Sequence, residues 1–476
     1  MNIDFSLITT EIALAILGLA IFTLGLIIPR SARKGLGNIA LLGLIIVLGI
    51  AVYSWPNQGE TLGGMYIVDH FSSFFKIVGL VAAILVVFGF RRYVAANVGN
   101  YLEYYSTIVF ATLGMIVMIS AGDFITLYLG LELMTISFIV LVAFRSFDVK
   151  SLEAGIKYLL LAGMSSAVLL YGLSLVYGAT GTILFAEVAQ SIIDGSGGLL
   201  LIIGLVMLIA GLGFKVSAAP FHMWSPDVYE GAPTSVTAFL ATGSKAASFA
   251  ILIRVFVGSL TGIQEHWVML VAVLAALSML IGNLIAIPQT NIKRMLAYSS
   301  VAQAGYIMVG IVAASQSGVK GVMFYSFIYV FATMGAFTVV AAVYNKIKSD
   351  EIADYAGLAQ RAPLAATVLL VCMLSMAGIP LLAGFVGKFY LFMAIVDGYM
   401  WLVLLGLIMS MVSVYYYLRV VLVMFRDDPV DPTPLKMETS VTITLLIALG
   451  VTVFLGIYPG PLSEIANTAA QSFFTP

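Results

Sequence analysis

Four ionisable residues lie within long apolar stretches: Glu132 in LYLGLELMTISF, Lys215 in GLGFKVSAAPFHMW, Lys245 in LATGSKAASFAI and Lys388 in GFVGKFYLF. A charged side chain is costly at the centre of a bilayer, so such residues face a protein interior or water. Burial favours the neutral forms of lysine and glutamic acid, whereas a nearby opposite charge restores the charged forms. Glu132 and Lys215 can therefore hold each other charged. The four residues predict a proton relay inside a membrane.

Other ionisable residues in or beside these stretches have more than one interpretation. His222, in APFHMW, titrates close to neutral pH, which suits a proton step, but a ring packed under a loop is an equally good interpretation. We expect Lys76 and Arg254 to extend toward lipid headgroups, because each lies within reach of the end of its predicted helix. Glu132 lies in the middle of its predicted helix, and its side chain is too short for that.

The elements that position these residues are predicted membrane helices. The chain of 476 residues is 62% hydrophobic and 9% charged, whereas a soluble domain has roughly 25% charged residues. A membrane helix needs about 20 apolar residues, and windows of that length predict an all-α polytopic protein with about 14 spans. The predicted spans are 8–28, 36–54, 69–90, 104–120, 123–144, 156–177, 199–219, 234–257, 267–287, 297–314, 320–344, 364–395, 400–425 and 439–458.

Two of these predicted spans contain a proline close to a lysine. Pro220 and Pro380 have no amide hydrogen, so the carbonyls of Val216 and Met376 lose their helical partners and the helices should break there. Matching interruptions in two halves of a chain are typical of transporters built from inverted repeats. The two interruptions are five spans apart, and an odd spacing places the two units in opposite orientations. We therefore predict an inverted repeat, with the seventh and twelfth helices broken.

The distribution of basic residues predicts the orientation of the chain. Of the 22 Lys and Arg residues, most lie at or beside the odd-numbered connections, including Arg30, Arg33, Arg91 and Arg361, whereas Lys320 lies on the other side. Because basic loops stay in the cytoplasm, both termini should be on the outer side of the membrane.

The composition also limits the chemistry of the chain. One cysteine, Cys372, excludes a disulfide framework and a thiolate metal site, and three scattered histidines form no ligand cluster. Three further residues are left open. Lys157 lies just inside its helix or caps it, and Asp227 and Glu230 serve capping and subunit contacts first and a proton inlet second. We expect Tyr306 and the tyrosines 415–417 to pack rather than to carry protons.

Three stretches carry a family resemblance. GLGFKVSAAPFHMWSPDVYEGAPTSVTAFLATGSKAASFAILIR (211–254), NIKRMLAYSSVAQAGYI (291–307) and AGIPLLAGFVGKFYLF (377–392) resemble the antiporter-like membrane subunits of respiratory complex I. PDVYEGAPT resembles the subunit N type more than its sisters L and M. The resemblance implies a fourteen-helix subunit of a proton-pumping NADH:quinone oxidoreductase in a bacterial plasma membrane. It also implies two inverted five-helix repeats, which gives the predicted segments 1–102 (three helices), 103–258 (first repeat), 259–426 (second repeat) and 427–476 (linker and last helix). Glu132, Lys215, Lys245 and Lys388 match the family's glutamate, its paired lysine, its bridging lysine and the lysine of the outward half-channel.

The resemblance also implies how the work is divided among subunits. NADH, FMN, iron–sulfur centres and quinone would be bound by other subunits, with no cofactor in this chain. Its partners would be the antiporter-like subunit M, the small subunits K and J, the lateral helix of subunit L, and lipids, but no nucleic acid.

Two alternatives remain from the sequence. A subunit of a multi-subunit cation/proton antiporter or of a membrane-bound hydrogenase would share the broken helices and buried lysines. A membrane-embedded transferase would instead gather carboxylates or histidines at one membrane face, and a scaffold would have no need of four buried charges.

Overall fold

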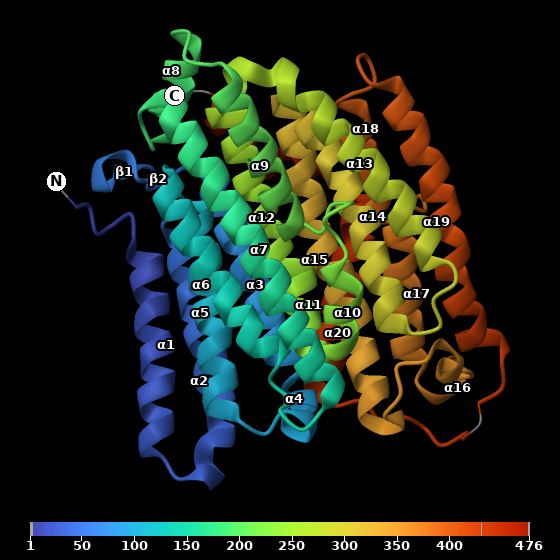
Figure 1. The fold of residues 1–476 in the computed structure, drawn as a ribbon. Helices are drawn as coiled ribbons and strands as arrows, with labels where there is room; N and C mark the ends of the chain where they lie inside the picture. Colours follow the sequence, from blue (N-terminus) through green and yellow to red (C-terminus); the bar gives the residue numbers. More distant parts are fainter. Residues whose placement is uncertain (1–2, 430, 475–476) are drawn as a thin grey trace.

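The computed structural model describes residues 3–429 and 431–474. Its long helices stand side by side in one bundle, with short connections at the two ends (Figure 1). The first part contains α1 (Thr9–Ile27), the 3₁₀ helix η1 (Arg30–Gly35), α2 (Leu36–Tyr53), β1 (Gly59–Thr61), η2 (Leu62–Gly64), β2 (Tyr66–Val68), α3 (His70–Gly89), α4 (Arg91–Asn97), α5 (Tyr101–Ile119), α6 (Phe124–Val142), α7 (Val149–Thr180), α8 (Phe185–Ile193) and α9 (Leu199–Lys215).

The second part begins with a long interrupted helix and ends with a short helix after the last predicted span. It contains α10 (Trp224–Gly231), α11 (Thr234–Phe239), the π-helical η3 (Leu240–Ser244), α12 (Lys245–Leu252), the π-helical η4 (Ile253–Ser259), η5 (Thr261–Ile263), α13 (Gln264–Ala286), α14 (Ile292–Val312), α15 (Gln316–Ile347), η6 (Ile352–Tyr355), α16 (Leu358–Arg361), α17 (Pro363–Ala377), α18 (Ala383–Met393), α19 (Met400–Arg426), α20 (Thr439–Ile457) and α21 (Gly460–Phe474).

The helical membrane fold predicted from composition is confirmed. In the described part of the chain, 12 helices are long and apolar enough to cross a membrane. The other two predicted spans coincide with shorter apolar helices, α9 for the one at 199–219 and the pair α17 and α18 for the one at 364–395. The count of fourteen stays a prediction. The antiparallel pair of β1 and β2 was not predicted from the sequence.

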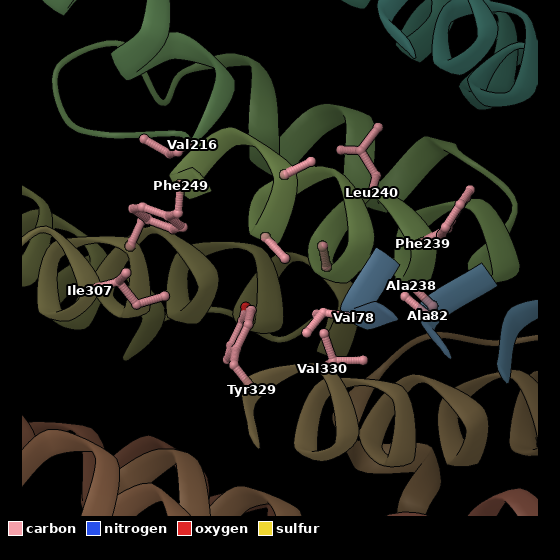
Figure 2. Packing of buried hydrophobic residues seen from close by; sticks show 14 of the residues in the cluster. Val78, Ala82, Val216, Ala238, Phe239, Leu240, Phe249, Ile307, Tyr329 and Val330 are labelled. Carbon is pink, nitrogen blue, oxygen red and sulfur yellow. The ribbon is translucent and has the colours of Figure 1, made fainter. Parts of the chain in front are cut away.

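The core lies where α3, α11, α12, α14 and α15 meet. Figure 2 shows Val78 of α3, Phe239 of α11, Phe249 of α12, Ile307 of α14 and Val330 of α15 packed together. Of an apolar stretch of 18 residues in the segment Thr234–Ser259, 100% of the residues are buried, whereas 33% are buried in the corresponding stretch of α1. The residues with candidate chemistry therefore lie on the central helices, and α1, α2 and α20 present apolar surface to lipid or to a partner.

Small residues bring two pairs of helices into backbone contact. A Cβ atom at Gly114 of α5 would meet the backbone of α6, and one at Gly130 of α6 would meet the backbone of α5. Gly282 of α13 and Gly305 of α14 approach each other's helices in the same way. Close approach through small residues is how membrane helices gain packing energy, because lipid gives them no hydrophobic reason to associate. The two pairs lie in the two predicted repeats, whose relation by inversion stays a prediction.

Candidate functional site

Lys215 is the last residue of α9, and its ammonium group points at α6. Its side chain is 4% exposed, and Nζ donates a hydrogen bond to the Thr135 hydroxyl at 2.9 Å. Glu132 lies one helical turn before Thr135 on α6, which places the two residues on the same face. Glu132 is partly buried, and its shielded Oε1 has no hydrogen-bond partner among the described residues.

The expected ion pair between Glu132 and Lys215 is not formed in this structure. Among the described residues, the ion pairs within 4.0 Å do not include one between Glu132 and Lys215. The Thr135 hydroxyl, in place of the carboxylate, is the direct partner of Lys215. It donates its own hydrogen bond to the carbonyl of Leu131 at 2.7 Å. In this arrangement Lys215 is therefore bound by a hydroxyl and not by a carboxylate.

Lys245 begins α12, directly after the π-helical turn η3. It is 2% exposed, and Nζ donates to both the carbonyl, at 2.8 Å, and the hydroxyl of Ser300 on α14. The Ser300 hydroxyl also lies 3.3 Å from the hydroxyl of Tyr229 on α10. Single π-helical turns inside α-helices are frequent at functional sites because they displace one side chain from the regular helical register.

Lys388 lies on α18 and is bound to the broken end of α17. It is 4% exposed, and Nζ donates to the Ala377 carbonyl at 3.1 Å and to the Ser410 hydroxyl at 2.7 Å. The Nζ atom of Lys388 lies 4.1 Å from the centroid of the Tyr306 ring. The π electrons of the ring favour a positive charge at this position. Lys388 and Ser410 also line a pocket of about 550 Å³ whose other lining residues are apolar, apart from backbone.

Two backbone carbonyls near Pro380 that have no helical partner accept hydrogen bonds from side chains. Helix α17 ends at Ala377 and α18 begins at Ala383. The carbonyl of Met376, which Pro380 deprives of its helical partner, accepts a hydrogen bond from Nε2 of Gln303 at 2.9 Å. The next carbonyl, that of Ala377, accepts from Lys388 and Ser410. Irregular backbone inside a membrane protein requires such partners, because lipid offers none.

The segment between α9 and α10 contains Pro220 and His222. Helix α9 ends at Lys215, before the proline, and Trp224 Nε1 donates to the carbonyl of Phe214 at 3.0 Å. The His222 ring lies 6.4 Å from the ring of Tyr298. Its Nδ1 is shielded and without a partner among the described residues, and no described hydrogen bond joins it to the three lysines. The proton step considered for His222 stays a prediction.

The interpretation of Lys76 and Arg254 as headgroup-seeking side chains is wrong. Lys76 is 4% exposed and forms an ion pair with Glu11 of α1 at 2.8 Å, and Arg254 is bound by both carboxylate oxygens of Asp69, the nearer at 2.9 Å. Each cation is buried because a carboxylate from another part of the chain meets it. Sequence reasoning missed these pairs because the partners are far apart along the chain.

A charge cluster joins α7, α10 and α14. Lys157 of α7 lies 2.6 Å from Asp227, Arg294 of α14 lies 2.7 Å from Asp227 and 3.0 Å from Glu230, and Lys150 lies 2.9 Å from Glu230. Burial alone would raise the pKa of Asp227 and of Glu230, but their basic partners outweigh it and hold both pKa values below the ordinary range. Asp227 lies in the first turn of α10, whose N-cap residue Met223 makes no side-chain cap. The capping, subunit-contact and inlet roles of the two acids stay predictions. Lys157 binds Glu153 and Asp227 and caps nothing.

Uncharged polar residues between Lys245 and Lys388 form a hydrogen-bonded set, in which Ser299, Gln303 and Asn283 were not singled out from the sequence. On α14, Ser299 hydrogen-bonds the Tyr417 hydroxyl, and Gln303 follows one turn later. Tyr416 donates to Asn283 at 3.1 Å, and Asn283 donates to the hydroxyl of Tyr306 at 3.3 Å. The packing role expected of the tyrosines is therefore incomplete, because the hydroxyls of these buried rings are hydrogen-bonded. Isolated serines and tyrosines in an apolar helix carry no sequence signal that separates this set from packing.

Known proteins resemble the chain over its whole length. The family described as "NADH:quinone oxidoreductase/Mrp antiporter, TM" matches residues 121–414. The chain is 71% identical to the NADH-quinone oxidoreductase subunit N of Desulforamulus reducens over 99% of both chains. It is 53% identical to the protein of the same name from Heliobacterium modesticaldum, over 99% of this chain and 100% of that one.

Solved structures agree with these relatives. A chain of respiratory complex I from Thermus thermophilus superposes with a TM-score of 0.83 at 33% identity, over 96% of this chain and 99% of that one. A chain of the Mrp complex from Dietzia has the same fold, with a TM-score of 0.88 at 20% identity and 98% of both chains covered. From its relatives at high identity, the chain belongs to the subunit N family of NADH-quinone oxidoreductases, within the wider NADH:quinone oxidoreductase/Mrp antiporter family.

Proposed function

We propose that the chain is the proton-translocating membrane subunit N of an NADH:quinone oxidoreductase and that Glu132, Lys215, Lys245 and Lys388 carry the protons. The observation that supports this most directly is the set of three buried lysines. Among the described residues none of the three has a carboxylate within 4.0 Å, and each is bound by hydroxyl or carbonyl oxygens. Uncharged acceptors serve the ammonium group without fixing its charge, so each lysine can lose and regain a proton.

The relay begins at the pair on α6 and α9. While the carboxylate of Glu132 is near, Lys215 is favoured in its charged form, and when the carboxylate turns away Lys215 releases a proton. Lys245 receives it and Lys388 passes it outward, with His222 as a further candidate at the segment between α9 and α10. Water bridges the stretches that side chains do not join.

The wider assembly follows from the same family. The chain is a multi-pass membrane subunit of a respiratory complex and has other membrane subunits of that complex as partners. Within the proposal these are subunits M, K and J and the lateral helix of subunit L, in a bacterial plasma membrane. NADH, FMN, iron–sulfur centres and quinone belong to other subunits. An iron–sulfur cluster requires several cysteine ligands, and the single Cys372 is buried in the core.

The test is proton translocation by the assembled complex in inverted membrane vesicles. Glu132→Ala and Lys215→Ala should each lower the number of protons translocated per quinone reduced, with the subunit still present by immunoblot. Lys320→Ala is the matched control, because the ammonium group of Lys320 lies over the ring of Tyr390, and no described hydrogen bond or ion pair joins it to the three lysines. Normal translocation by both test variants would overturn the relay, and transport driven by sodium would favour a cation/proton antiporter instead.

A further inference from the structure

Gln303 lies at the centre of the polar side chains between Lys245 and Lys388. It is 0% exposed and touches three other helices. Its Nε2 donates to the Met376 carbonyl of α17 at 2.9 Å and to the Tyr417 hydroxyl of α19 at 3.4 Å, and its Oε1 accepts from the Tyr325 hydroxyl of α15 at 2.5 Å. The orientation of the amide is fixed, because a carbonyl such as that of Met376 can only accept.

The groups on either side of Gln303 can pass protons. Toward Lys245, the hydroxyls of Ser299 and Tyr417 are hydrogen-bonded to each other, and Ser300, the neighbour of Ser299, binds Lys245 directly. Toward Lys388, the Ser410 hydroxyl binds both Lys388 and the Ala377 carbonyl. A hydroxyl donates and accepts through the same oxygen, so it can exchange one proton for another by rotating.

An amide cannot act in this way. It accepts through oxygen and donates through nitrogen, so a proton that arrives at one atom does not leave from the other. Gln303 therefore separates the Tyr417 hydroxyl from the broken end of α17. On the second connection, from Tyr416 to Tyr306, the amide of Asn283 has the same effect. The two carbonyls at the end of α17 are consecutive: Gln303 holds that of Met376, and Lys388 holds that of Ala377. Both the amide and the ammonium group thus depend on the position of the same helix end.

We infer that Gln303 is the positioning residue that gates proton transfer between Lys245 and Lys388. With its amide on the Met376 carbonyl, the two halves of the path are separated. Transfer occurs when the amide leaves that carbonyl and a hydroxyl or a water molecule takes its place. Because neutral hydrogen bonds contribute little net free energy, the released conformer is accessible as a minor population, on the order of 1%. This inference rests on the proposed relay.

Gln303→Glu tests the gate with almost no change of shape. A neutral carboxylic acid keeps a donor for Met376 and an acceptor for Tyr325, but it can also exchange its proton. The two halves of the path should therefore be connected permanently in this variant. We expect fewer protons translocated per quinone reduced, and a pH gradient that decays several-fold faster in vesicles without substrate. Gln303→Leu removes both hydrogen bonds and cannot exchange protons, so it should lower translocation per quinone without accelerating the decay.

The controls separate the gate from a structural role and from the relay itself. Gln289→Glu is the matched substitution, because the Gln289 amide also donates to a carbonyl, that of Ile285, but lies outside the path. If both Gln303 variants keep the wild-type ratio of protons to quinone, or lose translocation and quinone reduction in equal proportion, the gate is wrong. Lys245→Ala is measured alongside: wild-type translocation in this variant would overturn the relay, whereas a defect there with normal Gln303 variants would overturn only the gate.

Discussion

At the scale of single residues, two groups of buried charges have different partners. Lys76 and Arg254 form ion pairs with the carboxylates of Glu11 and Asp69. The lysines of the proposed relay face only hydroxyl and carbonyl oxygens among the described residues. The first group is suited to holding helices together, and the second is suited to changing its charge.

The pair of Glu11 and Lys76 offers a prediction about stability. Glu11→Ala leaves the ammonium group of Lys76 buried without its counter-charge, and breaking a buried pair in this way costs about 3–5 kcal/mol. The double variant Glu11→Leu with Lys76→Met removes both charges and should recover most of the loss. The measurement is the thermal unfolding temperature of the purified complex, together with the amount of subunit in membranes.

The proton-to-quinone ratio serves as the control for this pair. It should stay at the wild-type value in the double variant, because the pair holds α1 against α3 and lies outside the proposed relay. A double variant as unstable as Glu11→Ala would show that the charges themselves are not the cause of the loss.

At the scale of elements, the broken helix α17–α18 depends on one close approach. The amide of Gly384 donates to the Ser375 hydroxyl at 3.0 Å, and a Cβ atom at this position would collide with the carbonyl of Ser375. Lys388 lies one turn further along α18. The absence of a side chain at Gly384 therefore sets how near Lys388 comes to the end of α17.

Gly384→Ala should move α18 away from α17. Overpacking of this kind costs about 1–3 kcal/mol and would lengthen the contact between Lys388 and the Ala377 carbonyl. We expect a lower unfolding temperature and fewer protons translocated per quinone reduced. Gly163→Ala on α7 is the control, because no atom lies within 4 Å of the added methyl group. An equal loss in both variants would mean that helix packing at Gly384 is not responsible.

At the scale of the whole molecule, the start of α1 and the end of α21 lie at the same end of the bundle. Asp4, just before α1, donates to Thr61 of β1, and the ring of Phe473 of α21 packs on that of Phe71 at the start of α3, which follows β2. Figure 1 shows β1 and β2 toward this end and α4 and α16 at the opposite end. The segment Arg30–Gly35, with its three basic residues Arg30, Arg33 and Lys34, connects α1 to α2 at that opposite end. By the positive-inside rule we predict that this end is cytoplasmic and that both termini are on the outer side.

Fusion reporters test this orientation in bacterial cells. Alkaline phosphatase, which is active only outside the cytoplasm, should be active when fused to the C-terminus and inactive when fused after residue 35. Green fluorescent protein at the same two positions should give the reverse pattern. Fluorescence from the C-terminal fusion would contradict the proposed orientation.

The sequence alone predicted the helical membrane fold, which is confirmed, and it singled out the four ionisable residues of the proposed relay, whose roles stay a prediction. These properties are local. The length of an apolar run is enough to predict that it lies in lipid, and a proline lacks the amide hydrogen that a helix needs at that position. A lysine within such a run can be recognised without knowledge of the rest of the chain. The prediction that Pro380 frees the carbonyl of Met376 is of the same kind.

The tertiary structure decided which groups meet. Gln303 reaches the Met376 carbonyl, Lys215 donates to the Thr135 hydroxyl, and Lys76 pairs with Glu11, each across a long separation in the chain. No single segment contains both partners. The sequence does not distinguish a helical serine, threonine or glutamine that only packs from one that hydrogen-bonds another helix. The energy of each contact depends on distance and burial, which only the packed bundle fixes, and for that reason the relay lysines could be predicted but their partners could not.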